Sequence, residues 1–262
     1  MRLAYETFGE KNQKEILILH GLFGSKRNWF SIAKAIAVFG YKVWVLDLRN
    51  HGDSEWSENH TYFDLAYDVD NFLRENNIKD ACLMGHSMGG KAAMLFDLLY
   101  PNLLSKLIIV DIAPVKYFSP FGHYLEVLRS IDLHSFNKRS EVNEKISTQI
   151  DDANIRSFLL QNITVNQEGV LKWRINIKAL IENSLEISDF PDIQVNSSTK
   201  TLFLFGSNSE YSVSSQKDYI KKLFLSASFE EIKGAGHWVQ AEKPKDFLEI
   251  VSNFLKSNYS KN

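Results

Sequence analysis

The chain has a single cysteine, Cys82, in 262 residues, so no disulfide can form within it. Cys82 lies in an apolar, strand-like run, and we expect it to be a small core residue rather than a redox or nucleophilic group. Neither sign of charge is in excess, because 30 Lys and Arg against 32 Asp and Glu give a formal net charge of −2. The sequence therefore has no excess of positive charge of the kind that binds nucleic acid, and no polybasic patch of the kind that binds a membrane surface.

Long apolar segments are also missing. No run approaches the roughly 20 residues that a helix needs to cross a bilayer, and residues 1–6, Met-Arg-Leu-Ala-Tyr-Glu, lack the apolar core of a secretory signal. We therefore expect no membrane span and a cytoplasmic location. The overall composition, 44% hydrophobic and 24% charged, is ordinary for a globular protein. The length predicts one domain with an insertion and a substantial core.

The most informative segment present is residues 85–90, which read Gly-His-Ser-Met-Gly-Gly. It follows the apolar run 81–84 and precedes the helix-like run 91–96, so it predicts a strand, a tight turn and a helix. Such a turn holds a serine hydroxyl exposed, and the flanking glycines Gly85 and Gly89 let strand and helix approach closely around Ser87. We expect Ser87 to be a nucleophile and the Met88 N–H to be one donor to an oxyanion.

A second donor is expected from the loop at residues 20–25, which read His-Gly-Leu-Phe-Gly-Ser after the strand-like run 16–19. The carbonyl oxygen becomes anionic in the tetrahedral intermediate of acyl transfer, and two backbone N–H groups are needed to bind it. A glycine-rich loop at a strand end can turn such a group toward Ser87. Leu22 is the first choice for this donor, and Phe23 is the second.

The general base is expected to be His237. It is the one histidine of seven in a late, glycine-flanked loop, between the strand-like run 229–232 and a helix that begins near Pro244. His86 is expected to point away from the reacting atoms. The remaining histidines outside the first glycine loop are expected to be surface or hydrogen-bonded loop residues: His51, His60, His123 and His134. No pair among His20, His51 and His86 has the spacing of metal ligands, so no metal site is expected.

The acid that orients the base is open to two interpretations. One candidate is Glu210, the nearest carboxylate after the strand-like run 201–206, where Ser209 stands before it. Asp111, at the end of the strand-like run 107–110, is the alternative. It can still reach the histidine, because adjacent strand ends lie only about 5 Å apart. Asp111 is favoured, and Glu210 is kept as the alternative.

These motifs together resemble the α/β-hydrolase superfamily, and closely the YbfF-like group of small bacterial esterases. The matching segments are residues 20–25, 47–52, 85–91, 110–114, and 234–238 with 241–244. They run in the family's order through the whole chain. In the superfamily the acid commonly follows the penultimate strand, three residues after its terminal glycine, and Ser209 occupies that position here. The resemblance to the YbfF-like group implies instead that the acid is Asp111 and that Ser209 is a fourth polar member near His237. It also implies hydrolysis of carboxylic esters, with acyl thioesters such as acyl-CoA as further substrates.

The alternation of strand-like and helix-like runs predicts an α/β fold with a mostly parallel sheet and helices on both faces. The resemblance makes this the α/β-hydrolase fold, with residues 1–114 and 199–262 as its core. Residues 115–198 break the alternation, and we expect them to form a helical cap over Ser87. The last residues, 258–262, are expected to fray. Apolar side chains predicted to bind the substrate are Phe23, Phe118, Phe121 and Trp238.

The expected reaction is two-step acyl transfer through an acyl-enzyme intermediate, which needs no cofactor. An apolar acyl chain is favoured, because the cap is rich in Phe, Tyr and Leu and has no paired arginines. The partner is a small-molecule ester or thioester, and the sequence leaves open whether the protein is a monomer or a dimer. Three alternatives remain: a cofactor-free perhydrolase, a carbon–carbon bond hydrolase or lyase, and a ligand-binding protein without turnover.

Overall fold

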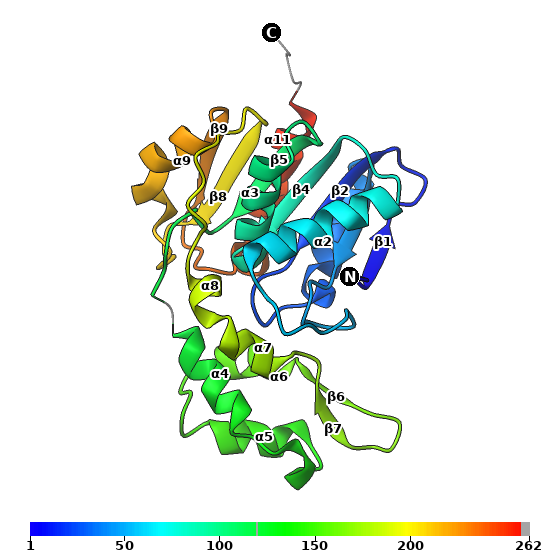
Figure 1. Cartoon of the computed structure of the whole chain (residues 1–262), viewed down its shortest axis with the longest axis vertical. Helices are drawn as coiled ribbons and strands as arrows, with labels where there is room; N and C mark the ends of the chain where they lie inside the picture. The colour runs from blue at the N-terminus through cyan, green and yellow to red at the C-terminus, as the bar shows by residue number, and fades with distance from the viewer. Residues whose placement is uncertain (119, 258–262) are drawn as a thin grey trace.

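The computed structural model describes residues 1–118 and 120–257, in which a seven-stranded sheet runs through the centre (Figure 1). The order in the sheet is β1-β3-β2-β4-β5-β8-β9, with β1 antiparallel to β3 and the other neighbours parallel. The strands are β1 (Tyr5–Phe8), β2 (Lys14–Leu19), β3 (Tyr41–Leu46), β4 (Ala81–His86), β5 (Leu104–Val110), β8 (Thr201–Gly206) and β9 (Ala227–Ile232). The mostly parallel sheet predicted from the alternating pattern is confirmed.

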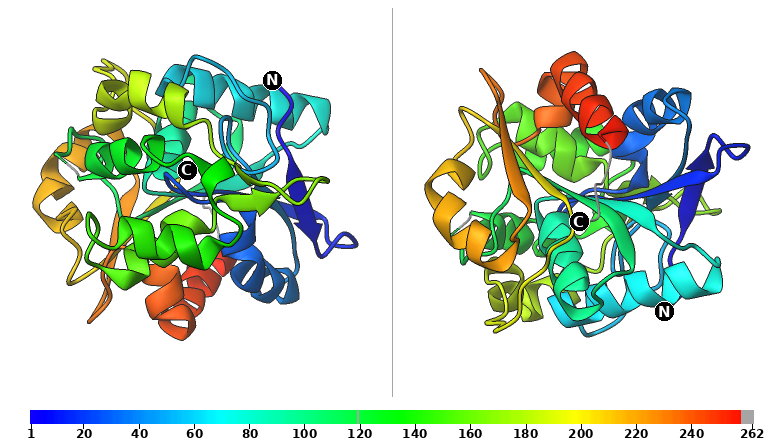
Figure 2. Two further views of the ribbon diagram at one scale, coloured as in Figure 1. Left: turned by 90° about the horizontal axis from the view of Figure 1, so that it is seen from below. Right: turned by 90° about the horizontal axis from the view of Figure 1, so that it is seen from above.

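Helices cover both faces of the sheet (Figures 1 and 2). On one face lie α2 (Tyr62–Glu75), α3 (Met88–Leu99), η3 (Val213–Gln216) and α9 (Lys217–Leu223). On the other lie η1 (Lys26–Trp29), α1 (Phe30–Val38), α10 (Val239–Glu242) and α11 (Pro244–Lys256). Each face has its own apolar core, because the strand residues alternate between the two sides. Cys82 lies in the second core, where burial raises the pKa of its thiol to about 12.

The start of the helix at Tyr62–Glu75 is fixed by its own sequence. Thr61 begins it as the N-cap, since its hydroxyl accepts from the Asp64 N–H at 3.1 Å and the Asp64 carboxylate accepts from the Thr61 N–H, also at 3.1 Å. These reciprocal bonds satisfy two of the N–H groups that a helix start leaves unpaired. The stripe Leu65, Val69 and Phe72 packs onto the sheet.

Most of the chain between β5 and β8 forms a separate layer beyond the carboxyl ends of the strands, and we call residues 115–198 the cap (Figure 1; Figure 2, left). Its last residues return along the core, where Phe190 packs and the Ser197 N–H donates to the Leu223 carbonyl at 2.7 Å. Its helices are α4 (Phe121–Arg129), η2 (Leu133–Ser135), α5 (Arg139–Ile146), α6 (Ala153–Leu160), α7 (Ile177–Glu182) and α8 (Ser184–Ser188). The cap has its own apolar cluster, which includes Phe23 from the core. It therefore packs directly onto the first glycine loop.

The cap differs from the purely helical insertion expected, since it also contains a hairpin of β6 (Ile163–Val165) and β7 (Leu171–Trp173). β-branched residues favour the extended strand at 163–165. The turn closes through the Asn166 N–H to the Val170 carbonyl at 2.8 Å, with Gly169 at φ +83°.

The expectation that residues 258–262 fray lies outside the described residues. Among residues 1–118 and 120–257, no helix is both long enough and apolar enough to cross a membrane.

Lys91 joins the core to the end of the cap. It lies one turn into α3, is only 2% exposed, and donates from Nζ to the carbonyls of Ser188 at 2.9 Å and Asp189 at 2.8 Å. Its ammonium also lies over the rings of Tyr62 and Tyr117, 5.6 and 5.2 Å from their centroids. Burial lowers the pKa of Lys91 to about 7. A neutral amine still has two N–H groups for the two carbonyls, so the junction survives deprotonation.

This junction predicts a pH-dependent contribution to stability. Between pH 7 and about 10.4 the unfolded chain holds a proton on Lys91 that the folded chain does not, so folding becomes more favourable as pH rises. Relative to Lys91→Met, the wild type should gain up to about 2 kcal/mol in unfolding free energy between pH 7 and pH 9. Urea unfolding of both proteins at several pH values measures this. A difference that does not change with pH would contradict it.

Candidate active site

Ser87 stands at the sharp turn between β4 and α3, with φ 53° and ψ −120°. This left-handed conformation is rare for a residue with a side chain and stores strain of about 1–3 kcal/mol. The turn is possible because of its glycines: a Cβ on Gly85 would overlap the carbonyl oxygen of Gly89, and one on Gly89 would lie 2.5 Å from the His20 carbonyl oxygen. The Ser87 hydroxyl therefore stands at the carboxyl edge of the sheet, at the start of a helix.

His237 and Asp111 meet beside Ser87 although 126 residues separate them. His237 Nδ1 lies 2.7 Å from Asp111 Oδ2. Because a carboxylate oxygen accepts, Nδ1 carries the proton and Nε2 is left free to take one. Two further donors hold the same carboxylate, which is fully buried: the Ser209 hydroxyl bonds Oδ2 at 2.5 Å and the Gly206 N–H bonds Oδ1 at 3.0 Å.

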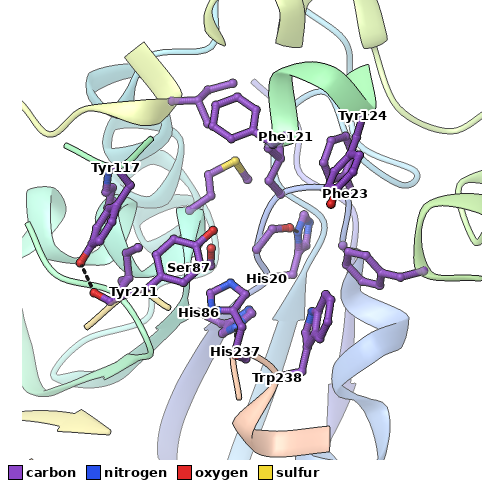
Figure 3. A pocket seen from close by; sticks show the side chains of 18 of the residues that line it. His20, Phe23, His86, Ser87, Tyr117, Phe121, Tyr124, Tyr211, His237 and Trp238 are labelled. Carbon is purple, nitrogen blue, oxygen red and sulfur yellow. Dashed lines mark hydrogen bonds between the residues drawn. The ribbon is translucent and has the colours of Figure 1, made fainter. Parts of the chain in front are cut away.

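Two aromatic rings enclose the His237 imidazole (Figure 3). The Tyr211 ring stacks on it at 4.1 Å between centroids and 22° between planes. His86 lies on another side, 4.6 Å away, and donates from Nε2 to the His237 carbonyl at 2.9 Å. Burial, followed by the nearby His237, lowers the pKa of His86 well below its usual value, so His86 stays neutral and donates from Nε2. His86 thus holds the backbone of His237.

The first glycine loop comes close to Ser87 because Gly21 has no side chain. A Cβ at this position would lie 3.0 Å from His86 Nδ1 and 3.1 Å from Ser87 Cβ. The following residues form a turn closed by the Gly24 N–H to the Gly21 carbonyl at 2.9 Å, with Phe23 at φ +61°. Leu22 lines the pocket, as does Met88 at the start of α3.

These groups open into a cavity of about 530 Å³ between core and cap. Its walls are mainly apolar and aromatic, which suits the hydrocarbon part of a small-molecule ligand. Phe23, Phe121, Tyr124 and Trp238 surround the space above Ser87 (Figure 3). The rings of Trp238 and Phe158 are in contact across the core–cap boundary, at 5.4 Å between centroids.

The structure brings together in one pocket most of the residues singled out from the sequence: Ser87, His237, Leu22, Met88, Phe23, Phe121 and Trp238, with Asp111 and Ser209 bonded behind His237. Phe118 differs from the others, since its side chain is 96% exposed at the rim. Glu210 is an exposed residue of the pocket wall, and the carboxylate bonded to His237 is that of Asp111.

Tyr211 is a functional-site candidate that the sequence did not reveal, and His86 contacts His237 rather than pointing elsewhere. Their neighbours come from distant segments, so no local motif marks them. His51 and His60 were expected at the surface or hydrogen-bonded in loops. Both are buried and hydrogen-bonded, His51 Nδ1 with the Arg49 carbonyl at 2.9 Å and His60 Nδ1 with Asn50 Nδ2 at 3.2 Å, so the second expectation holds. Burial lowers their pKa values, that of His51 to about 3. Across residues 1–118 and 120–257, no three His, Cys, Asp or Glu side chains are arranged to hold a metal ion.

Comparison with known proteins agrees with this architecture. Residues 14–244 match the family model described as the alpha/beta hydrolase fold. The sn-1-specific diacylglycerol lipase ABHD11 of Xenopus tropicalis is 39% identical, with 97% of this chain and 82% of that protein covered. Esterase YbfF of Escherichia coli strain K12 is 30% identical, with 96% and 97% covered.

A solved structure described as a marine microorganism esterase superposes with a TM-score of 0.92 at 35% identity, covering 96% of this chain and 98% of that one. The family match spans well over half of the chain, and the relatives are similar over nearly its full length. The resemblance inferred from the motifs is thereby confirmed: the chain belongs to the alpha/beta hydrolase family.

Proposed function

We propose that this carboxylic ester hydrolase cleaves esters of apolar acids through an acyl-enzyme intermediate on Ser87. The observation that supports this most is the hydrogen bond between His237 and Asp111 at 2.7 Å, since His237 lines the same pocket as Ser87, which is held at a strand–turn–helix. It fixes the tautomer in which Nε2 can accept a proton. The aromatic pocket over Ser87 supports an apolar acyl group.

In the first half of the proposed reaction, Ser87 Oγ attacks the ester carbonyl while its proton passes to His237 Nε2. The C–O π electrons move to the carbonyl oxygen, which the N–H groups of Leu22 and Met88 stabilise. The tetrahedral intermediate then collapses, and His237 returns the proton to the departing alcohol or thiol. The buried Asp111 carboxylate offsets the positive charge that His237 holds between these two steps.

In the second half, water replaces the leaving group. His237 takes a proton from the water as its oxygen bonds the acyl carbon, and gives that proton back to Ser87 as the acid departs. Ser209 supports the scheme through its bond to the same Asp111 oxygen that His237 uses. A thioester reacts by the same steps with a thiol as leaving group, so acyl thioesters such as acyl-CoA are included in the proposed substrate class.

The first test of this proposal is covalent labelling. An alkyl fluorophosphonate should attach to Ser87, because an activated serine displaces fluoride from phosphorus as it attacks a carbonyl. Tryptic mass spectrometry should locate the adduct on the peptide that contains Ser87, and Ser87→Ala should remain unlabelled and lose ester hydrolysis. Labelling at another residue of active wild-type protein would exclude Ser87 as the nucleophile.

The acid can be identified by comparing three variants on one ester. Asp111→Asn keeps the side-chain shape but removes control of the His237 tautomer, and kcat should fall by about 10⁴, as in serine proteases. Glu210→Gln should lose less than about tenfold, because its carboxylate contributes only to the local field. Ser209→Ala removes one hydrogen bond worth about 0.5–1.5 kcal/mol, which corresponds to roughly 2- to 12-fold.

The measurement is kcat/KM with circular dichroism as the check on folding. A loss of kcat/KM in Glu210→Gln equal to that in Asp111→Asn would contradict the assignment of Asp111. It would identify Glu210, in the loop after β8 where the superfamily usually has its acid, as the acid.

We further propose that the cap, residues 115–198, sets the preference for acyl-chain length. Phe121 and Phe158 line the cavity from the cap, whereas Trp173 packs in the cap cluster and lies outside the cavity wall. Phe121→Ala and Phe158→Ala should shift the optimum among p-nitrophenyl esters of C2 to C12 acids, with acetate hydrolysis changed less than about threefold. Trp173→Leu is the matched control and should keep the wild-type profile. Identical profiles in all four proteins would remove this role from the cap.

A further inference from the structure

The first glycine loop is held in an unusual backbone conformation at Phe23. Its φ of +61° lies in the left-handed region, which favours glycine over a residue with a bulky side chain. Its side chain is nevertheless buried, 6% exposed, in the apolar cluster of the cap. A conformation of this kind persists only where surrounding contacts hold it, and here those contacts come from the cap.

Asn162 supplies the polar part of this contact. It lies in the cap between α6 and β6 and is only 4% exposed. Its Nδ2 donates to the Phe23 carbonyl at 2.8 Å and to the Leu159 carbonyl at 3.1 Å. Both hydrogens of the amide are used, so the side chain has no freedom to turn away. The cap thereby fixes the peptide group that joins Phe23 to Gly24.

The same peptide group orients the proposed oxyanion donor. Its N–H, on Gly24, donates to the Gly21 carbonyl at 2.9 Å, and His20 Nδ1 donates to that carbonyl at 2.8 Å. The Gly21 carbonyl belongs to the peptide whose N–H is that of Leu22. Since the N–H and C=O of a trans peptide point in opposite directions, holding the Gly21 carbonyl fixes the direction of the Leu22 N–H.

From this geometry we propose that Asn162 is a positioning residue for the oxyanion hole. It acts from the cap through two consecutive peptide groups, Phe23–Gly24 and Gly21–Leu22, and does not touch the substrate. The inference rests on the proposed function, in which Leu22 stabilises the tetrahedral oxyanion. It assigns the cap a part in the chemical step in addition to binding the acyl chain.

The neighbouring residue provides a matched comparison. Gln161 also bonds the core from the cap, since its Oε1 accepts from Asn28 Nδ2 at 2.7 Å, but this bond reaches η1 and not the turn at residues 21–24. The Gln161 bond is exposed, whereas the Asn162 bonds are buried. If Asn162 only anchors the cap, its replacement should therefore lower stability or raise KM without lowering kcat. If Asn162 positions the Leu22 N–H, only its replacement should slow the chemical step.

The experiment compares Asn162→Leu with Gln161→Leu on p-nitrophenyl acetate, whose short acyl group makes little use of the pocket. Loss of one oxyanion donor costs about 10²- to 10³-fold, and misdirection should cost less. We expect kcat to fall about 10- to 100-fold in Asn162→Leu with KM within about twofold. For Gln161→Leu both constants should stay within about twofold of wild type.

An alkyl trifluoromethyl ketone gives a second readout that a purely structural role would not change in the same way. Ser87 Oγ adds to its carbonyl, the proton passes to His237, and the product is a hemiketal oxyanion in the same hole. The inhibition constant should weaken in Asn162→Leu by the same factor as kcat/KM, as expected for a transition-state analogue. In Gln161→Leu it should be unchanged.

Equal losses of kcat in the two variants, or a rise in KM with inhibitor affinity unchanged, would overturn the proposal. Should Asn162→Leu fail to fold, Asn162→Ala against Gln161→Ala gives the same comparison, with an expected loss of about three- to tenfold because a water can bond the Phe23 carbonyl. Absence of ester hydrolysis by the wild type, or full activity of Ser87→Ala, would instead refute the proposed function. Both outcomes are measured on proteins that keep Asn162, so they are distinct from failure of the positioning role.

Discussion

The buried carboxylate of Asp111 is the constraint on which the arrangement of the pocket depends. A charge removed from water is tolerated only where hydrogen bonds replace its hydration. Asp111 receives three, from Gly206 at the end of β8, Ser209 in the following loop, and His237 beyond β9. Satisfying one charge therefore ties together the carboxyl ends of three strands. The loop after β9 cannot move away without leaving that charge short of a donor.

The proposed acid, Asp111, lies at the end of β5 rather than after β8, and the sheet explains why this exchange is possible. The two strands are neighbours, with Val110 paired to Leu204, so their ends lie about 5 Å apart. An Asp at either end can reach the same imidazole nitrogen. Ser209 occupies the vacated position and donates to Asp111 Oδ2. The serine cannot supply charge, but it places a donor where a second carboxylate would have repelled the first.

The sequence predicts those features of the site that depend on residues close together in the chain. It does not predict those that depend on contacts between distant segments. The turn at Ser87, and with it the position of Met88 at the start of α3, follows from a few adjacent residues, since glycines at fixed offsets allow only one close approach of strand and helix. Tyr211 could not be recognised in this way, because its contact with His237 depends on how two loops pack. The hairpin in the cap escaped prediction for a related reason: three-residue strands are too short to show a period of two.

The fold and the pocket are linked by more than the sheet. Ser87, Asp111 and Phe23 all have positive φ, with values of 53°, 54° and 61°. Each is a residue with a side chain in a conformation that costs free energy, and each is held by contacts from another part of the chain. For Asp111 these contacts come from β8 and the loops that follow β8 and β9, and for Phe23 they come from the cap.

Strain held in this way is released if the supporting contact is lost, so the core cannot keep its loop geometry independently of the cap. The cap therefore does more than cover the pocket, because it also supports the backbone of a loop that lines it. Its apolar cluster and Asn162 support the backbone conformation of the loop near Ser87, and the pocket and the proposed oxyanion hole share the same supporting contacts. A change that reshapes the cap for a different acyl group must preserve these contacts if the chemical step is to be kept.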